Sequence, residues 1–486
     1  MLKLQDPSLL RMQAFLAGKW IDADSGQTVP VTDPATGETI GTVPMCGVTE
    51  TVRAIEAAES AQKTWAARPA KERSAILRRL NDLMLANQDD LALIMTSEQG
   101  KPLAESKGEI AYAASFIEWF AEEARRVYGD TIPAAQADRR ILAIKQPIGV
   151  TAAITPWNFP TAMLTRKVGP ALAAGCSMVV KPATQTPYSA LAFAELAQRA
   201  GVPDGLLSVL TGSASEIGGE MTRSPIVRKL SFTGSTAVGR TLMRKCADTV
   251  KKLSLELGGN APFIVFDDAD IDAAVEGAMV SKYRNTGQTC VCANRIYVQR
   301  GALAEFTQKL VAKVAAMQVG PGVEPGVTQG PLIDAKAVAK IEEHVQDALA
   351  KGGQVLVGGK RHMLGGQFYE PTVIGSATSD MLVAHEETFG PLAPIFAFDT
   401  EAEAIASAND TEFGLASYLY SRDIGRVMRV AEALEAGIVG VNTGLISTAE
   451  APFGGVKQSG LGREGSKYGL EDFLEIKYIC LAGLGL

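Results

Sequence analysis

The amino-acid sequence predicts an α/β protein with a doubly wound parallel sheet. From about residue 148, short apolar runs alternate with helical stretches, which is the pattern of β-α-β units. The apolar runs expected to be strands are 148–154, 177–180, 206–210, 229–232 and 253–255. Helical stretches between them include 188–199 and 236–247. Between residues 50 and 125, apolar residues recur every three or four positions, so this region is expected to be mainly helical.

Further along the chain, a second βα-rich region begins with the apolar run 262–266 and continues to about residue 455. The last stretch, 473–486, has the pattern of a strand. No internal repeat is visible, so we expect two α/β units and some additional segments.

Composition excludes several classes of protein. The 486 residues include 47 Lys and Arg against 54 Asp and Glu, a net charge of −7, and contain no basic tract. This balance argues against nucleic acid or an anionic membrane as a partner. The start of the chain lacks the apolar core of a signal peptide, and no apolar run is long enough to span a bilayer. Six cysteines are too few for a disulfide scaffold, so we expect a cytoplasmic enzyme acting on a small molecule.

Polar and glycine residues follow each predicted strand of the first unit. These segments are 155–158, 181–182, 211–212, 233–235 and 256–259. In open α/β sheets, ligands bind outside the carboxyl ends of the strands. The sequence therefore predicts a ligand site at this edge of the sheet.

Two glycine-containing segments are candidate phosphate loops. Segment 460–465 (GLGREG) matches the dinucleotide fingerprint, but no strand precedes it, so a structural loop is favoured. Segment 234–239 (GSTAVG) lies between a predicted strand and helix, where free backbone N–H groups suit a phosphate. An ordinary strand-to-helix turn is the alternative.

Three residues are candidates for covalent chemistry. Cys290 lies in a polar, glycine-containing segment, which is a poor setting for a core residue and a suitable one for a thiolate nucleophile. Glu256, at a strand end, is either a general base or an exposed carboxylate. Asn158 either donates to an oxyanion or caps a turn. No metal is expected, because Cys-x-Cys is not the usual ligand spacing and the three histidines form no motif.

Taken together, seven motifs are more specific than any one of them. They are TPWNFP (155–160), KPA (181–183), FTGS (232–235), ELGG (256–259), GQTC (287–290), ETFGP (387–391) and PFGG (452–455). With these motifs the chain resembles the aldehyde dehydrogenase superfamily over nearly its whole length. Segments 115–123 and 462–469 look like its succinate-semialdehyde dehydrogenase branch.

The resemblance implies a role for each matching residue. Cys290 would be the nucleophile and Glu256 the general base, and Asn158 would form the oxyanion hole with the backbone N–H of Cys290. NADP would be bound, and preferred over NAD because position 184 is a neutral threonine. The implied cofactor-binding residues are Thr155, Pro156, Trp157, Lys181, Thr184, Gly234, Ser235, Leu257, Glu387 and Phe389. The implied substrate-binding residues are Arg166, Arg284 and Ser447.

The resemblance also implies an organisation. A Rossmann-type dinucleotide-binding domain would comprise 1–125 and 148–256, and a catalytic α/β domain 257–457. Segments 126–147 and 458–486 would form a small oligomerisation sheet, giving a homotetramer or dimer.

The implied reaction is oxidation of succinate semialdehyde to succinate through a cysteine thiohemiacetal and thioester. One alternative is glutarate semialdehyde, because one methylene changes binding by only about 1–3 kcal/mol. A CoA-acylating enzyme would not need Glu256. A non-catalytic protein on the same fold would be expected to lack Cys290, Glu256 or Asn158, and all three are present.

Overall fold

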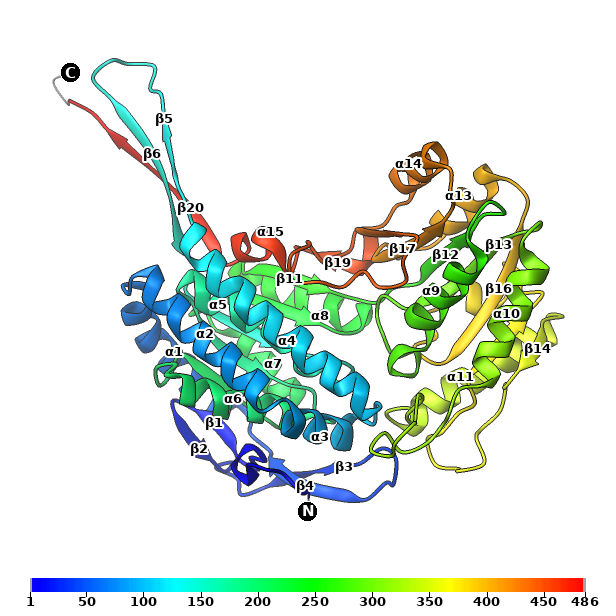
Figure 1. Ribbon diagram of the computed structural model, residues 1–486. Helices are drawn as coiled ribbons and strands as arrows, with labels where there is room; N and C mark the ends of the chain where they lie inside the picture. The colour runs from blue at the N-terminus through cyan, green and yellow to red at the C-terminus, as the bar shows by residue number, and fades with distance from the viewer. Residues whose placement is uncertain (1, 484–486) are drawn as a thin grey trace.

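The computed structural model describes residues 2–483 and shows two α/β lobes and a thin sheet that projects from the first (Figure 1). The first lobe is built on an eight-stranded sheet with the order β19-β11-β10-β7-β8-β9-β1-β2. Its parallel centre comprises β7 (Val150–Ile154), β8 (Ser177–Lys181), β9 (Leu207–Val209), β10 (Val227–Thr233) and β11 (Lys252–Glu256). These five strands match the five predicted apolar runs.

Three short strands extend this sheet in the antiparallel sense. They are β1 (Ala14–Leu16), β2 (Lys19–Ile21) and β19 (Gly460–Leu461). Gly460–Leu461 belongs to the GLGREG segment, for which a structural loop is favoured over a dinucleotide fingerprint. The pairing of β19 with β11 places the segment after residue 457 against the first lobe.

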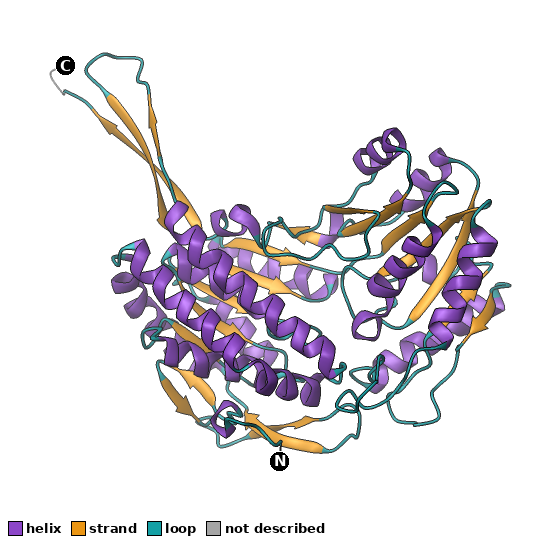
Figure 2. Cartoon of the chain, viewed as in Figure 1, coloured by secondary structure: helices purple, strands orange, loops and turns teal. Residues whose placement is uncertain are grey.

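Helices cover both faces of the first sheet (Figure 2). One face carries α2 (Ala70–Ala86), α3 (Gln88–Gln99), α4 (Leu103–Glu123), α5 (Ala162–Ala174) and α6 (Pro187–Ala200). The other carries α1 (Val48–Ala66), α7 (Ala214–Arg223) and α8 (Thr236–Cys246). Successive strand residues point to opposite faces, so Ala153 joins the first core and Ala152 the second. The predicted doubly wound α/β class is confirmed.

The second lobe has a seven-stranded sheet with the order β14-β15-β16-β13-β12-β17-β18. Its strands are β12 (Ala261–Val265), β13 (Ala293–Gln299), β14 (Gln354–Val357), β15 (Thr372–Gly375), β16 (Leu392–Phe398), β17 (Ala416–Tyr420) and β18 (Ile438–Val441). One core joins this sheet to α9 (Ile271–Tyr283) and α10 (Leu303–Ala315). Another joins it to α11 (Ala335–Ala350), α12 (Leu382–His385), α13 (Glu401–Asn409) and α14 (Ile424–Ala433).

The projecting sheet contains β20 (Leu474–Leu481), β6 (Arg140–Pro147) and β5 (Asp130–Ile132), all antiparallel. Figure 1 shows it extending well beyond the first lobe, near α15 (Ser466–Glu471). The strand expected over 473–486 is thus present as β20, and its residues 484–486 lie outside the described part of the chain. A separate hairpin, β3 (Thr28–Thr32) and β4 (Thr39–Pro44), lies beside the first lobe.

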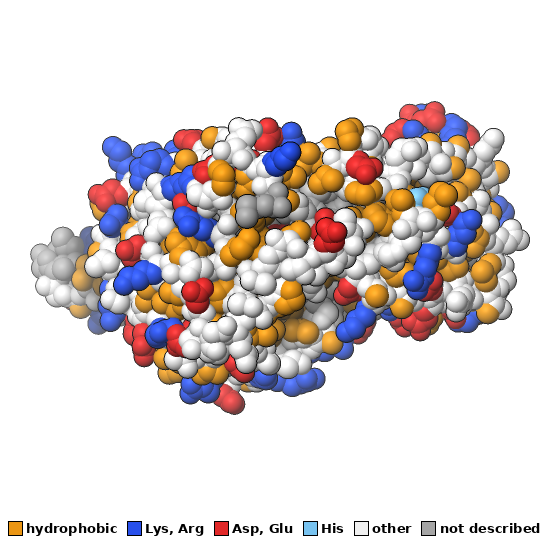
Figure 3. All heavy atoms as spheres, turned by 90° about the horizontal axis from the view of Figure 1, so that it is seen from below, with side chains coloured by type: hydrophobic (Ala, Val, Ile, Leu, Met, Phe, Trp, Pro, Cys, Tyr) orange, Lys and Arg blue, Asp and Glu red, His pale blue; other side chains and the backbone are white. Residues whose placement is uncertain are grey.

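Charges of both signs are interspersed on the face of the molecule seen in Figure 3. That distribution agrees with the small net charge of −7 and gives no single-sign surface on this face. Within residues 2–483, no helix combines the length and the apolar character needed to cross a membrane.

Candidate active site

The carboxyl ends of the central strands meet at one edge of the first sheet. Ile154 at the end of β7 pairs with Lys181 on one side and with Phe232 on the other, and Thr233 pairs with Glu256. A cavity of about 230 Å³ opens at this edge, towards the second lobe. It is lined by Pro156, Trp157, Asn158, Thr233, Gly234, Ser235, Glu256, Leu257, Gly258, Cys290, Glu387 and Phe389. Most of the residues singled out in the sequence therefore share one pocket.

Cys290 lies on the loop between the short 3-10 turn 284–287 and β13, and it is half-buried. The loop packs tightly against Gly259, which follows β11. A Cβ added at Gly259 would lie only 2.6 Å from the Cys290 carbonyl oxygen. Burial raises the pKa of the Cys290 thiol to about 12, and the positive charges of Arg166 and Arg284 oppose that rise. The thiol therefore depends on nearby cations and a proton acceptor to react as a thiolate.

Glu256 is buried, and neither of its carboxylate oxygens has a hydrogen-bond partner among the described residues. Burial raises its pKa well above the ordinary value, and the negative charge of Glu464 raises it further. A carboxyl group with free oxygens and a raised pKa is suited to accept and release a proton as a general base.

Glu464 belongs to a buried charged cluster beside this carboxylate. It accepts a hydrogen bond from Lys167, whose Nζ also donates to Thr233 Oγ1 at 2.6 Å. The positive charges of Lys167 and Arg166 lower the pKa of Glu256 and so partly offset the effect of Glu464.

Asn158 is held at both its side chain and its backbone. Its Nδ2 donates to the Gln288 carbonyl oxygen at 3.1 Å, which uses one of the two amide hydrogens. Its own carbonyl oxygen accepts from Lys101 Nζ at 2.6 Å and from Asn285 Nδ2 at 2.9 Å. The remaining amide hydrogen is available to a ligand in the pocket that Asn158 and Cys290 share.

The start of α8 is suited to a phosphate. Ser235 is the N-cap residue, but its side chain makes no capping hydrogen bond, so the first N–H groups of this 11-residue helix are not capped by it. A Cβ at Gly234 would lie 2.5 Å from the Phe232 ring, so the chain can pass from β10 to α8 beside this ring only with glycine at position 234. These features fit a dinucleotide phosphate.

Lys181 and Thr184 lie beside the pocket, at the end of β8. Lys181 Nζ donates to Thr184 Oγ1 at 3.1 Å and to the Pro182 carbonyl oxygen at 2.8 Å. Burial lowers the pKa of Lys181 to about 8. Thr155 adjoins them, because its N–H donates to the Lys181 carbonyl oxygen at 3.1 Å. A cation and a neutral hydroxyl thus stand together at this strand end.

Glu387 and Phe389 form the opposite wall of the pocket. Glu387 accepts a hydrogen bond from Gly259 N–H at 3.2 Å, and burial raises its pKa to about 7. A Cβ at Gly258 would lie 2.9 Å from Glu387 Oε2, so the glycine permits this contact. Phe389 has a φ of 53° and packs edge-on against Trp157 with ring centroids 5.6 Å apart.

Arg166 presents unused hydrogen-bond donors close to Cys290. Its buried guanidinium lies 4.3 Å from the ring centroid of Phe453 and 4.9 Å from that of Phe116. Nη2 donates to the Tyr112 hydroxyl, whereas Nε and Nη1 have no hydrogen-bond partner in the described structure. Nη1 faces Glu464 only at an ion-pair distance of 3.4 Å.

Arg284 provides a second guanidinium. Its Cζ lies 5.0 Å from the ring centroid of Phe159. The Arg284 carbonyl oxygen accepts from Thr289 Oγ1 at 3.4 Å, whereas the guanidinium makes no hydrogen bond or ion pair with any residue from 2 to 483. Both arginines are close enough to Cys290 to affect its pKa. The site therefore contains a nucleophile candidate beside two cations that can bind an anion.

Tyr112 is a site residue that the sequence analysis missed. It contacts Arg166 through its hydroxyl. Burial raises the pKa of Tyr112, and the charge of Arg166 and a neighbouring Ser447 hydroxyl partly oppose that rise. Tyr112 thus links two of the expected substrate-binding residues. The available signal was the spacing of Tyr112 and Phe116, which lie one turn apart on the same helix and both face Arg166.

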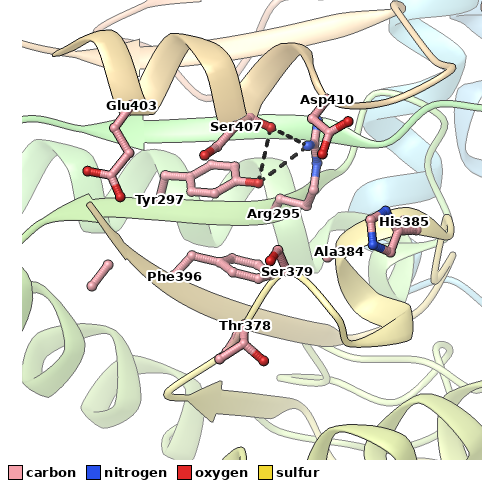
Figure 4. Close-up of a pocket in the computed structure, with 12 residues that line it drawn as sticks. Arg295, Tyr297, Thr378, Ser379, Ala384, His385, Phe396, Glu403, Ser407 and Asp410 are labelled. Atoms are coloured by element: carbon pink, nitrogen blue, oxygen red, sulfur yellow. Dashed lines mark hydrogen bonds between the residues drawn. The ribbon is translucent and has the colours of Figure 1, made fainter. Parts of the chain in front are cut away.

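A second hollow, of about 300 Å³, lies in the second lobe between α13 and the strands β13 and β16 (Figure 4). Arg295 lines it, but its guanidinium already donates to the carbonyl oxygens of Asn260, Ser407 and Ala408. Arg295 therefore braces the end of α13, and the hollow contains none of the candidate catalytic residues.

Comparison with known proteins agrees with this geometry. The model of the aldehyde dehydrogenase family matches residues 20–479, so the chain belongs to that family.

Individual relatives are similar over their whole length. The chain is 68% identical to the glutarate-semialdehyde dehydrogenase of Pseudomonas aeruginosa, covering 99% of this chain and 100% of the relative. It is 64% identical to the NADP⁺ succinate-semialdehyde dehydrogenase of Escherichia coli, again over 99% and 100%. The crystal structure of succinate-semialdehyde dehydrogenase from Burkholderia pseudomallei superposes with a TM-score of 0.98 at 67% identity, covering 99% of both chains.

Proposed function

We propose that this chain oxidises succinate semialdehyde to succinate, with NADP⁺ as the preferred cofactor and NAD⁺ as a second. The observation that carries the proposal is the pair of guanidinium groups of Arg166 and Arg284 near Cys290, of which Arg166 leaves Nε and Nη1 without a hydrogen-bond partner among the described residues. A substrate with an aldehyde at one end and a carboxylate at the other suits such a pair. Ser447, near Tyr112, adds a hydroxyl to the same anion site. The similarity to named succinate-semialdehyde dehydrogenases supports this substrate class.

In the proposed reaction, the thiolate of Cys290 attacks the aldehyde carbon and forms a C–S bond. The carbonyl oxygen becomes an alkoxide that accepts hydrogen bonds from Asn158 Nδ2 and the Cys290 backbone N–H. The unpartnered carboxylate of Glu256 is the available acceptor for the thiol proton and later for a proton of water. Loss of a hydride from the tetrahedral carbon, which the bound dinucleotide would accept, turns the alkoxide into a thioester. After Glu256 has released the first proton to solvent, that water attacks the thioester, releases the acid and regenerates Cys290.

The bound dinucleotide supplies the hydride acceptor for the oxidation. The chain would hold its phosphates at the start of α8, through Gly234 and Ser235. Lys181 and Thr184 would contact the adenosine ribose side, where a neutral hydroxyl and a cation accommodate a 2′-phosphate. Thr155, Pro156, Trp157, Leu257, Glu387 and Phe389 would complete the cofactor site.

Glutarate semialdehyde is the second candidate substrate. Relatives with that name are 68% identical to this chain. One additional methylene changes transition-state binding by only about 1–3 kcal/mol, so the same two arginines would also bind the longer carboxylate.

The test is the rate of NADPH formation, followed by absorbance, with succinate semialdehyde, glutarate semialdehyde and propanal. We expect kcat/KM to be highest for succinate semialdehyde and at least about tenfold lower for propanal, which has no carboxylate. Cys290→Ala serves as the inactive control. A higher kcat/KM for glutarate semialdehyde would favour the second candidate, and equal values for propanal would remove the anion site from the proposal.

A further inference from the structure

A buried lysine stands directly behind Asn158. Lys101 lies in the turn between α3 and α4 and is only 1% exposed. Its Nζ donates to the Asn158 carbonyl oxygen at 2.6 Å and to Glu109 Oε2 at 2.5 Å. It also lies 3.9 Å from the ring centroid of Phe159. Burying an ammonium group costs several kcal/mol unless it is well paired, and here one of its partners is the backbone of a candidate catalytic residue.

Asn285 links the same carbonyl group to the loop that carries Cys290. Its Nδ2 donates to the Asn158 carbonyl oxygen at 2.9 Å and to the Gln288 carbonyl oxygen at 3.1 Å. Gln288 in turn accepts the hydrogen bond from Asn158 Nδ2. The side-chain amides of Asn158 and Asn285 and the carbonyl groups of Asn158 and Gln288 therefore form one closed hydrogen-bonded ring. Gln288 lies two residues before Cys290.

The turn that contains Lys101 also holds Asn285. Gln99 Nε2 donates to Asn285 Oδ1 at 2.9 Å, and the Lys101 N–H donates to Gln99 Oε1 at 3.0 Å. The Asn285 N–H donates to Glu105 Oε2 at 2.7 Å. Asn285 has a φ of 52°, which is unfavourable for a non-glycine residue and is stabilised here by these contacts.

We propose that Lys101 is a positioning residue for the oxyanion hole: through its Nζ it fixes the Asn158 peptide, and with that peptide the spacing between the Asn158 amide and the Cys290 backbone N–H. This inference rests on the proposed function, in which these two groups bind the alkoxide oxygen. Such donors must lie within about 2.7–3.1 Å of the oxygen, and a displacement of about 1 Å can lower the rate by a factor of about 100. Lys101 has no contact with the reacting atoms and acts only through Asn158.

The experiment compares Lys101→Met, Asn158→Ala and the double variant in the full-length chain. Two rates are measured: the pre-steady-state formation of NADPH from succinate semialdehyde, and the alkylation of Cys290 by iodoacetamide. Alkylation uses the same thiolate but forms no alkoxide at the oxyanion hole. Lys107→Met is the matched control, because Lys107 lies on α4 with an exposed side chain and pairs with Asp89 at 2.8 Å.

We expect Lys101→Met to slow NADPH formation by about tenfold or more, with little change in KM or in the alkylation rate. In the Asn158→Ala background, the same substitution should add no more than about twofold, because the side-chain amide that Lys101 positions is already missing. The Lys107→Met control should match the wild type in both rates.

Removing Lys101 takes the paired cation away from the buried Glu109, which keeps only its hydrogen bonds from the Thr161 and Ala162 N–H groups. A second variant therefore tests the same idea with this ion pair intact. Asn285→Gly removes the linking amide but keeps Lys101 and Glu109 paired, and glycine readily adopts the positive φ. It should also slow NADPH formation and be non-additive with Asn158→Ala.

Full additivity of either substitution with Asn158→Ala, or an equal loss of the alkylation rate, would overturn the inference and indicate general structural support. If Asn158→Ala itself leaves NADPH formation unchanged, the oxyanion role in the proposed function fails, and the positioning role fails with it. The inference alone fails if Asn158→Ala is slow while Lys101→Met and Asn285→Gly are not.

Discussion

At the scale of single residues, burial acts in the same direction on the two groups proposed for covalent chemistry. It raises the pKa of both Cys290 and Glu256 and so favours their neutral forms. The neighbouring charges then determine how much of each reactive form exists. Arg166 lowers both pKa values, whereas Glu464 raises that of Glu256.

The charge of Glu464 should therefore be visible in the pH dependence of turnover. A general base acts when deprotonated, so kcat should rise with pH through the raised pKa of Glu256. Glu464→Gln removes the negative neighbour, which should lower that pKa and move the rising limb of the kcat profile to lower pH. Glu471→Gln, a half-exposed carboxylate on α15, is the control. A profile that does not move would mean that Glu256 does not limit turnover.

Arg284 should determine affinity for the carboxylate end of the substrate. Arg284→Met keeps an apolar stem against Phe159 but removes the guanidinium. We expect KM for succinate semialdehyde to rise by about tenfold or more, the equivalent of about 1.4 kcal/mol, because a charged hydrogen bond is lost. KM for propanal should hardly change. Equal increases for both substrates, or a similar effect of the exposed Arg422→Met, would indicate a structural role.

At the scale of secondary-structure elements, the end of β8 should determine the choice of cofactor. Thr184→Glu puts a carboxylate beside Lys181, where it would neutralise the cation and repel a 2′-phosphate. We expect the ratio of kcat/KM for NADP to that for NAD to fall by about tenfold or more. Thr184→Val, which adds no charge, should change the ratio much less.

The same ratio should depend on pH in the wild type. Lys181 is charged below its lowered pKa of about 8 and loses its charge above it. The preference for NADP should therefore weaken as the pH rises from about 7 to about 9. A ratio that is constant over this range would remove Lys181 from the 2′-phosphate site.

The loop between Cys290 and Cys292 bears on whether the two thiols form a regulatory disulfide. Cys292 is buried, its Sγ donates to the Lys282 carbonyl oxygen at 3.4 Å, and its N–H donates to Thr289 O at 3.0 Å. Between the cysteines, Val291 O accepts from the Tyr418 hydroxyl at 2.7 Å. These contacts hold the Cys292 thiol in the core, and a bridge would require the loop to give them up.

We therefore expect wild type and Cys292→Ala to recover activity equally when peroxide treatment is followed by dithiothreitol. A redox lock would give the opposite result: the wild type would recover, and the variant, which lacks a resolving thiol, would stay inactive.

The individual strands and helices also show how much of the fold could be predicted from the sequence alone. The five central strands and their polar ends were predicted because buried parallel strands are short apolar runs with distinctive residues after them. Helix α3 lies within the region 50–125 that was expected to be mainly helical, but its bounds could not be predicted, because the buried polar residues Ser97, Glu98 and Gln99 interrupt its apolar period. Glu98, for example, accepts the Tyr188 and Ser189 N–H groups at the start of α6, a contact between residues about 90 positions apart.

The same limit applies to the candidate site. Cys290, Glu256 and Asn158 occur in recognisable motifs, whereas Arg166 and Arg284 were expected only from the family resemblance. Lys101 lies 57 positions from Asn158, and its contact depends on how the turn after α3 packs. No local pattern reports such a contact.

At the scale of the whole molecule, the projecting sheet is the feature that the two lobes do not explain. Its strands β20, β6 and β5 extend away from the first lobe (Figure 1), and Ile476 and Tyr478 on β20 are 73% and 64% exposed. Exposed apolar residues on an edge strand favour association with another chain. We therefore expect a homo-oligomer, a dimer or a tetramer, that buries this sheet.

Two lysine substitutions should test that assembly. Ile476→Lys together with Tyr478→Lys would put two charges on β20 and oppose its burial against another chain. We expect the mass measured by light scattering to fall by at least about half relative to the wild type, as a dimer or tetramer dissociates. Because the substituted positions are exposed and far from the pocket in sequence, the circular dichroism spectrum should be unchanged. Lys477→Ala, on the same strand, is the control for any change at this position. An unchanged mass in the double variant would mean that the projecting sheet does not hold the oligomer together.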